Sequence, residues 1–140
     1  MRALLALALW AALPLGASAA RKEKLVSQDL QWKGQFCGVS VPGTRLAKTP
    51  AEWEALWKEI GRPAPAQDLK GQMAVAVFLG ERPTGGFRVQ FLEPKTAKER
   101  VTVGYRVLPP KGMAIQAFTQ PYAVRLLPLP KLPVELIEEK

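Results

Sequence analysis

The clearest hydrophobic pattern in the chain has helical spacing and lies near its middle. Large apolar residues recur at intervals of three and four and so share one face of a helix: Trp53, Leu56, Trp57 and Ile60. Thr49 suits the N-cap, Pro50 the first helical position and Glu52 the third residue after the cap, while Gly61 suits the stop. We therefore expect an amphipathic helix between Thr49 and Gly61, with its tryptophans packed against a sheet rather than holding a ligand.

The segments after this helix follow the two-residue period of strands. Residues 73–79 are apolar on both faces, which is typical of a central strand covered on both sides. Residues 87–91 and 101–107 alternate between apolar and polar positions. Weaker segments complete the set, the first pair as a hairpin and the second pair as the final strands: 35–40, 44–48, 113–118 and 122–127. Together they predict an α+β fold, mainly an antiparallel β sheet or sandwich of about five to seven short strands with one early amphipathic helix.

The N-terminus has the order of a Sec-type signal peptide. Arg2 precedes an apolar run over residues 3–15, and small residues follow it, so we expect a signal peptide over residues 1–20 with cleavage after Ala19 or Ala20. The run is shorter than the roughly 20 residues that span a bilayer, although a retained membrane anchor is the alternative. The predicted location is secreted or periplasmic, in the cell envelope, without stable membrane insertion once the signal is removed.

The rest of the chain is long enough for one domain only. We expect a loose lead-in over residues 21–34, the domain over 35–128, and an extended tail over 129–140 that forms an edge or a frayed end. Cys37 is the only cysteine, so no internal disulfide is possible. Its apolar surroundings predict a buried, inert thiol, with a free reactive thiol as the alternative.

The charge balance is basic, with 20 Lys and Arg against 12 Asp and Glu and a formal net charge of +8. On an exported protein, this excess favours anionic lipid, envelope polymers or an acidic partner protein. The basic residues are dispersed and do not alternate with aromatic residues, so we expect no nucleic-acid partner.

The residues needed for common catalytic sites are scarce. The chain has no His, which excludes Ser-His and Cys-His pairs, imidazole bases and imidazole metal ligands. The serines and aspartates after the signal occur in no nucleophile-elbow or cation-loop motif: Ser27, Ser40, Asp29 and Asp68. We expect a protein that is not an enzyme, with no catalytic residue, no cofactor and no metal.

A glycine-rich turn over residues 82–87, which we call the glycine turn, is the densest local signal. It lacks the phosphate-loop pattern and instead suggests a rigid connection between strands, which either presents groups to a partner or merely turns the chain. A second aromatic segment anchored by proline lies at residues 120–122. We expect the two segments to be adjacent tips of one partner-binding surface, which needs Phe87 and Tyr122 to be exposed rather than in the core: Arg82, Pro83, Thr84, Gly85, Gly86, Phe87, Gln120, Pro121 and Tyr122.

The order of these features resembles the C-terminal domain of the PrcB family of protease-complex subunits, over about residues 39–127. The matching sequence is the Thr-Gly-Gly-aromatic turn and the Pro-Tyr segment: Thr84, Gly85, Gly86, Phe87, Pro121 and Tyr122. The resemblance implies a small exported accessory domain that associates with a subtilisin-like surface protease and stabilises it, without catalysis of its own.

Two alternatives remain open from the sequence. Residues 82–87 are similar to the Asn-Pro-Thr-Thr-Gly-aromatic loop of chagasin-like inhibitors, which are immunoglobulin-like sandwiches, and this similarity implies inhibition of cysteine proteases through that loop. The basic charge alone would also allow the binding of an anionic envelope polymer or lipid.

Overall fold

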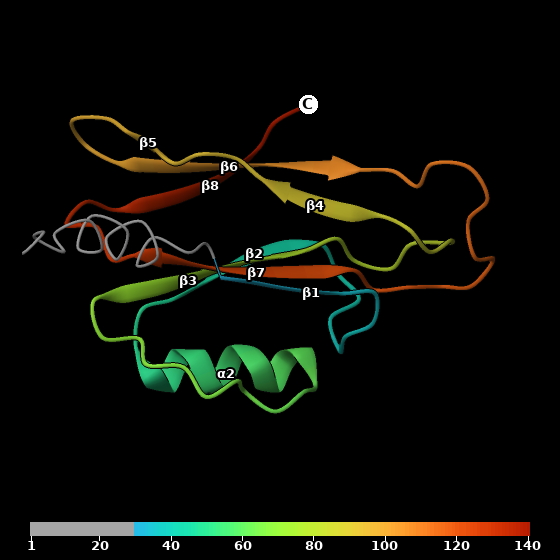
Figure 1. Ribbon diagram of the computed structural model, residues 1–140, viewed down its shortest axis with the longest axis horizontal. Helices are drawn as coiled ribbons and strands as arrows, with labels where there is room; N and C mark the ends of the chain where they lie inside the picture. The colour runs from blue at the N-terminus through green and yellow to red at the C-terminus, as the bar shows by residue number, and fades with distance from the viewer. Residues whose placement is uncertain (1–29) are drawn as a thin grey trace, which may run out of the picture.

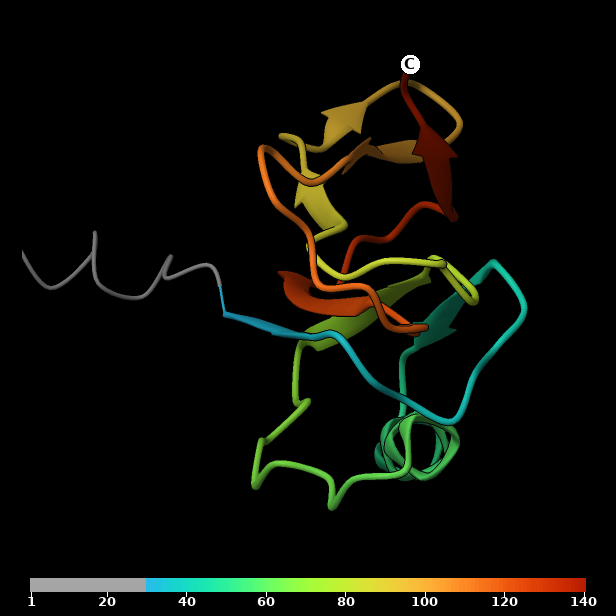
Figure 2. The same cartoon turned by 90° about the vertical axis from the view of Figure 1, so that its right-hand side faces the viewer.

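Two stacked β-sheets and one helix make up this computed structural model, which describes residues 30–140 (Figure 1). The helix covers the outer face of the first sheet, and the second sheet covers the inner face (Figure 2). The predicted signal peptide and nearly all of the lead-in fall in residues 1–29, outside the described residues. Within residues 30–140, no helix is both long enough and apolar enough to cross a membrane.

The first sheet is antiparallel throughout, in the order β1-β7-β3-β2. Its strands are β1 (Gln31–Gly34), β7 (Tyr122–Pro128), β3 (Gln72–Phe78) and β2 (Gly43–Ala47). The second sheet is built on β6, which pairs antiparallel with β4 and β5 and parallel with β8. Its strands are β4 (Arg88–Phe91), β5 (Lys95–Thr96), β6 (Val101–Leu108) and β8 (Val134–Glu138).

The predicted α+β class, a mainly antiparallel sandwich with one early helix, is confirmed. Two predicted strands are wrong. Residues 35–40 form no hairpin with 44–48, because β2 pairs with β3 and because Gly38 N–H donates to the Ile60 carbonyl at the end of the helix. Residues 113–118 form a loop, and the hydrogen bond from Gly85 N–H to the Ile115 carbonyl is a single link rather than a strand ladder.

The ordered domain extends beyond both predicted boundaries. β1 lies within the expected lead-in, because Trp32 packs edge-to-face on Trp53 and Trp57, with ring centroids 5.4 and 6.0 Å apart. β8 lies within the expected tail and forms an edge strand on β6, which is one of the two outcomes expected there, and its Val134 and Leu136 pack against the core between the sheets. Each added strand therefore buries apolar side chains, although its short, weakly patterned sequence does not predict a strand.

The helix α2 (Pro50–Ile60) forms where its pattern predicts. Glu52 N–H donates to Thr49 Oγ1 at 3.2 Å, and the Glu52 carboxylate accepts from Lys48 N–H at 3.3 Å, one residue before the N-cap. Gly61 ends the helix with a φ of 88°. The predicted apolar stripe faces the first sheet and is buried, which confirms that the tryptophans form part of the core.

The central strand β3 is covered on both faces, as its continuous apolar sequence predicts. Ala74, Ala76 and Phe78 contact the helix side. Met73, Val75 and Val77 contact the second sheet. The small alanines leave room beneath the helix for a cluster of mutually edge-on aromatic rings: Trp32, Trp53, Trp57 and Tyr122.

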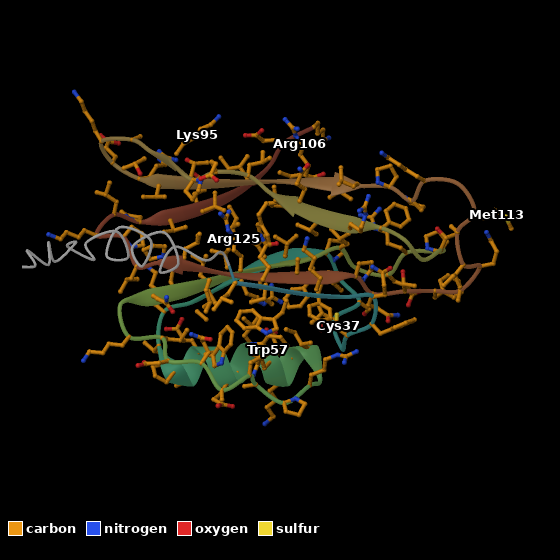
Figure 3. All side chains as sticks on the ribbon, viewed as in Figure 1. Cys37, Trp57, Lys95, Arg106, Met113 and Arg125 are labelled. Atoms are coloured by element: carbon orange, nitrogen blue, oxygen red, sulfur yellow. The ribbon has the colours of Figure 1, made fainter. Side chains whose placement is uncertain are left out.

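Arg125 is a charged residue buried between the two sheets (Figure 3). Its Nη1 donates to the Leu92 carbonyl at 2.8 Å, and its guanidinium lies 5.8 Å from the Phe91 ring centre. These contacts join β7 of the first sheet to the end of β4 in the second. They hold the end of β4 in position against the first sheet.

Candidate partner-binding site

The two segments predicted to form the site lie side by side at one end of the sandwich. Arg82 and Thr119 form an isolated antiparallel bridge, in which each backbone N–H donates to the other's carbonyl at 2.8 and 2.9 Å. Thr119 is only 2% exposed, and its hydroxyl donates to the Thr84 carbonyl at 3.0 Å. Thr119 therefore joins residues 82–84 to residues 120–122, a role with no local signal in the sequence.

Gln35 provides a second link that sequence reasoning missed. Its Nε2 donates to the Phe87 carbonyl at 2.9 Å, and its Oε1 accepts from Gly86 N–H at 3.0 Å. Its backbone carbonyl accepts from Gln120 N–H at 2.8 Å. One residue thus bonds to both predicted segments, across separations of 51 and 52 residues for its side-chain bonds.

Replacing Gln35 with alanine is expected to lower the free energy of unfolding by about 1–2 kcal/mol, because both side-chain hydrogen bonds are lost and the turn is released. Amide hydrogen exchange should accelerate at Gly86 while remaining unchanged in β3, which lies in the core. Unchanged exchange at Gly86 would contradict this bracing role.

The prediction that Tyr122 is exposed is wrong. Tyr122 is 5% exposed, with its ring edge-on to Trp57 at 6.4 Å, and Pro121 is also buried. The Tyr122 ring covers Gly34 so closely that a Cβ at Gly34 would lie 2.5 Å from it. Pro121 and Tyr122 therefore lie in the core beneath the site. The register of β7 directs the Tyr122 ring toward the helix.

The glycine turn is only partly accessible to a partner. Gly85 is buried, and Phe87 is half-buried, packing toward the core between the sheets beneath the Arg82 guanidinium at 5.0 Å from its ring centre. The Arg82 Nε also donates to the Leu79 carbonyl at 3.2 Å. Pro83 and Gly86 are the exposed members of this turn, and Thr84 and Gln120 are half-buried. Neighbouring segments therefore hold most of the backbone of residues 82–87, and a chagasin-like inhibitory role for this loop stays a prediction.

A neighbouring loop projects instead. Residues 109–118, which we call the tip loop, carry Met113, Ile115 and Phe118 with exposed fractions of 102%, 74% and 67%. Figure 3 places Met113 at the far end of the molecule from the β5 turn. Phe36 and Val41 are also exposed, on the segment that crosses the same end of the first sheet (Figure 2). The spacing of residues 35–40 and 113–118 predicts strands, whereas both segments are loops that expose apolar side chains.

A cavity of about 390 Å³ separates the tip loop from the glycine turn. Gly85 and Gly86 line one side of it, and Pro110, Met113 and Ile115 line the other. Gly86 has a φ of 94°, and a Cβ there would lie 2.7 Å from the Pro110 Cβ. Glycine at this position therefore permits the close approach of the two loops.

Few groups in the structure suggest bond-making chemistry. Burial is the main cause that raises the pKa of the Cys37 thiol above its usual value of 9.0, so little thiolate forms at neutral pH. The thiol is half-buried and donates to the Val39 carbonyl at 3.6 Å, which fits an inert residue. Within residues 30–140, no cluster of Cys, Asp and Glu has the size and arrangement to hold a metal ion.

Comparison with known proteins supports the resemblance found in the sequence. The family model described as PrcB C-terminal matches residues 73–125, from β3 to β7, and so includes the glycine turn and the tip loop. An uncharacterized protein of Methanocaldococcus jannaschii is 33% identical over 48 residues, which cover 34% of this chain and 30% of that protein. No solved structure matches. The match over residues 73–125 therefore supports the resemblance of this chain to the PrcB C-terminal family.

Proposed function

We propose that this protein is a non-catalytic exported accessory domain that binds and stabilises an envelope or secreted protein. The PrcB C-terminal match suggests an accessory domain of a protease complex, and it makes a subtilisin-like protease the first partner to test. The observation that carries the proposal is the tip loop, which holds three large apolar side chains in water.

The exposed side chains of the tip loop favour a binding role because they contribute nothing to the core. Clusters of exposed apolar side chains on a soluble domain commonly mark a surface that a partner covers. Burying them on a partner contributes roughly 25 cal/mol for each Å² of apolar surface removed from water. Met113, Ile115 and Phe118 therefore supply the anchors of the proposed interface.

The bracing of the tip loop lowers the entropic cost of binding. Pro109 and Pro110 restrict its start, and hydrogen bonds at Ile115 and Thr119 tie it to the glycine turn. Less conformational freedom is then lost when a partner docks. This arrangement supports binding, rather than catalysis, as the role of the site, in keeping with a chain that has no His.

The groups with shifted pKa values do not form a common reactive site. Burial raises the pKa of Cys37, which packs against the helix-side core, and it raises the pKa of Tyr105 in the second sheet, with a further contribution from Glu138. The first sheet separates the two groups. Enzyme sites usually gather such groups in one cleft, so their separation supports a non-catalytic role.

Serine at Met113, Ile115 and Phe118 together is expected to weaken partner binding by about a hundredfold or more, because the variant removes three central apolar anchors. The melting temperature should change little, since the three side chains are exposed. The measurement is affinity purification of the tagged protein from the exported fraction of its own cells, identification of the bound protein, and titration of that protein with each variant.

The matched control places serine at Leu46, Leu129 and Ile137, which are also exposed but lie outside the tip loop. This control should retain full affinity. Equal affinity of the tip-loop variant and the wild type would contradict the proposal. The stabilising role predicts a longer half-life of the purified partner when the accessory domain is present, and that gain should disappear with the tip-loop variant.

A further inference from the structure

We infer that the occupant of this site is an extended, acidic segment of the partner that also carries apolar residues. This inference rests on the proposed function and adds the chemistry of the partner. The segment would lie in a groove that runs from the tip-loop cavity, past Arg88, to the neighbouring edges of the two sheets.

The groove consists of two adjoining hollows. The first is the cavity of about 390 Å³ beside the tip loop, and the second, of about 250 Å³, lies between β1 and β4. Arg88 lines both hollows and so lies between them. β1 and β4 lie on the same side of the sandwich (Figure 2). An extended chain that passes Arg88 can therefore contact both hollows.

The charges along the groove are all positive. Lys33, Arg88 and Lys111 line it, and no Asp or Glu does. Among the described residues, none of these three has a carboxylate within ion-pair distance, whereas Arg45 pairs with Glu59 and Arg100 pairs with Glu135. Complementary charge on a partner would therefore be acidic.

The walls of the groove explain why we expect the occupant to be extended and to carry apolar residues. Pro110, Met113 and Ile115 give the first hollow an apolar lining, which an apolar side chain of a partner can contact. β1 and β4 are edge strands, so each has backbone groups that another strand could pair with. An extended main chain can use these groups, and its alternate side chains can face the apolar wall and Arg88.

An anionic membrane surface is the main competitor for a basic, apolar site. A bilayer is broad and would contact the projecting tip loop but would not enter the hollow between β1 and β4. An extended peptide reaches both hollows. The two separate hollows with basic lining, which share Arg88, therefore favour the peptide.

The test uses fluorescence anisotropy with the purified protein and three labelled probes, which are short peptides of alternating Glu-Leu, Gln-Leu and Lys-Leu. We expect the Glu-Leu peptide to bind at least about tenfold more tightly than the Lys-Leu peptide, and its affinity to fall as salt rises. Arg88→Glu should weaken Glu-Leu binding by about tenfold. Lys95→Glu makes the same charge change on β5, outside the groove, and should leave the affinity unchanged.

Equal binding of the three peptides, or Glu-Leu binding unaffected by Arg88→Glu, would overturn the inference. Binding of phosphatidylglycerol vesicles but not of the Glu-Leu peptide would overturn it in favour of a membrane surface. If Arg88→Glu retains the exported partner and serine at Met113, Ile115 and Phe118 loses it, the proposed function stands and the inference fails. If the Glu-Leu peptide binds as expected but the tip-loop variant retains its partner, the proposed function fails.

Discussion

Trp57→Ala is expected to lower the free energy of unfolding by about 3–5 kcal/mol, because it truncates a large side chain in the core. Trp57 is 3% exposed and lies edge-on to three rings: Trp32, Trp53 and Tyr122. Truncation would leave a cavity at the centre of the contact between α2 and the first sheet. Urea unfolding monitored by far-UV circular dichroism gives the measurement, and a loss below about 1 kcal/mol would contradict it.

A conservative pair of substitutions separates the packing of Trp57 from its polar group. The Trp57 Nε1 is buried without a hydrogen-bond partner, whereas the Trp53 Nε1 donates to the Pro65 carbonyl at 3.2 Å. An unmet buried donor costs about 1–3 kcal/mol, so Trp57→Phe removes an unfavourable group and Trp53→Phe removes a favourable one. Although both residues are 3% exposed, Trp57→Phe should cost less stability. The reverse order would show that the unmet donor has little effect.

Gly80→Ala is expected to lower the free energy of unfolding by about 3 kcal/mol, through left-handed strain of about 1–2 kcal/mol and a steric cost of similar size. Gly80 has a φ of 73°, and a Cβ there would lie 2.6 Å from Pro42 Cδ and 2.9 Å from Pro42 N. Because one of these atoms belongs to the backbone, the segment around Pro42 would have to move. Chemical unfolding of the variant measures the combined cost.

Gly71→Ala is the matched control for this substitution. Gly71 has a φ of 71°, but an added Cβ would meet nothing within 4 Å, so only the conformational strain applies. The difference between the two variants therefore measures the steric term. Pro42→Ala in the Gly80→Ala background should recover part of the loss. Equal losses at Gly80 and Gly71 would show that contact with Pro42 is unimportant.

The Gly80 substitution should also affect binding, because it lies between the core and the site. Glu81 N–H donates to the Ser40 carbonyl, and Arg82 then forms the bridge to Thr119. A shift at Gly80 would displace this bridge and, with it, the end of the tip loop. Gly80→Ala should therefore weaken binding of the Glu-Leu peptide more than Gly71→Ala does.

The features that the sequence predicts correctly depend on neighbouring residues. The helix combines a local cap with an apolar stripe, and β3 is apolar at every position that the core covers. The glycine turn was identifiable because Pro83, Gly85 and Gly86 restrict or permit particular backbone conformations within a few residues. These signals were enough to locate one part of the candidate site before any contact was known.

The position of each segment in the sheets required the tertiary structure. The spacing of residues 35–40 and 113–118 fits a strand, yet strand formation depends on a partner that local sequence does not specify. Likewise, Tyr122 and Phe118 are both aromatic residues near Pro121, but one is 5% and the other 67% exposed. The pattern shows that a side chain is apolar without showing what covers it.

The sequence by itself determines four properties of this protein: a capped amphipathic helix, an antiparallel strand-rich domain, a basic charge and the absence of imidazole chemistry. Composition and local spacing are enough to set all four. Only the tertiary structure decided that Gln35 and Thr119 brace the glycine turn, that Tyr122 is in the core, and that the tip loop projects beside a basic groove. The physical reason is that these features arise from contacts between distant segments, whose free energies depend on packing and register rather than on local sequence.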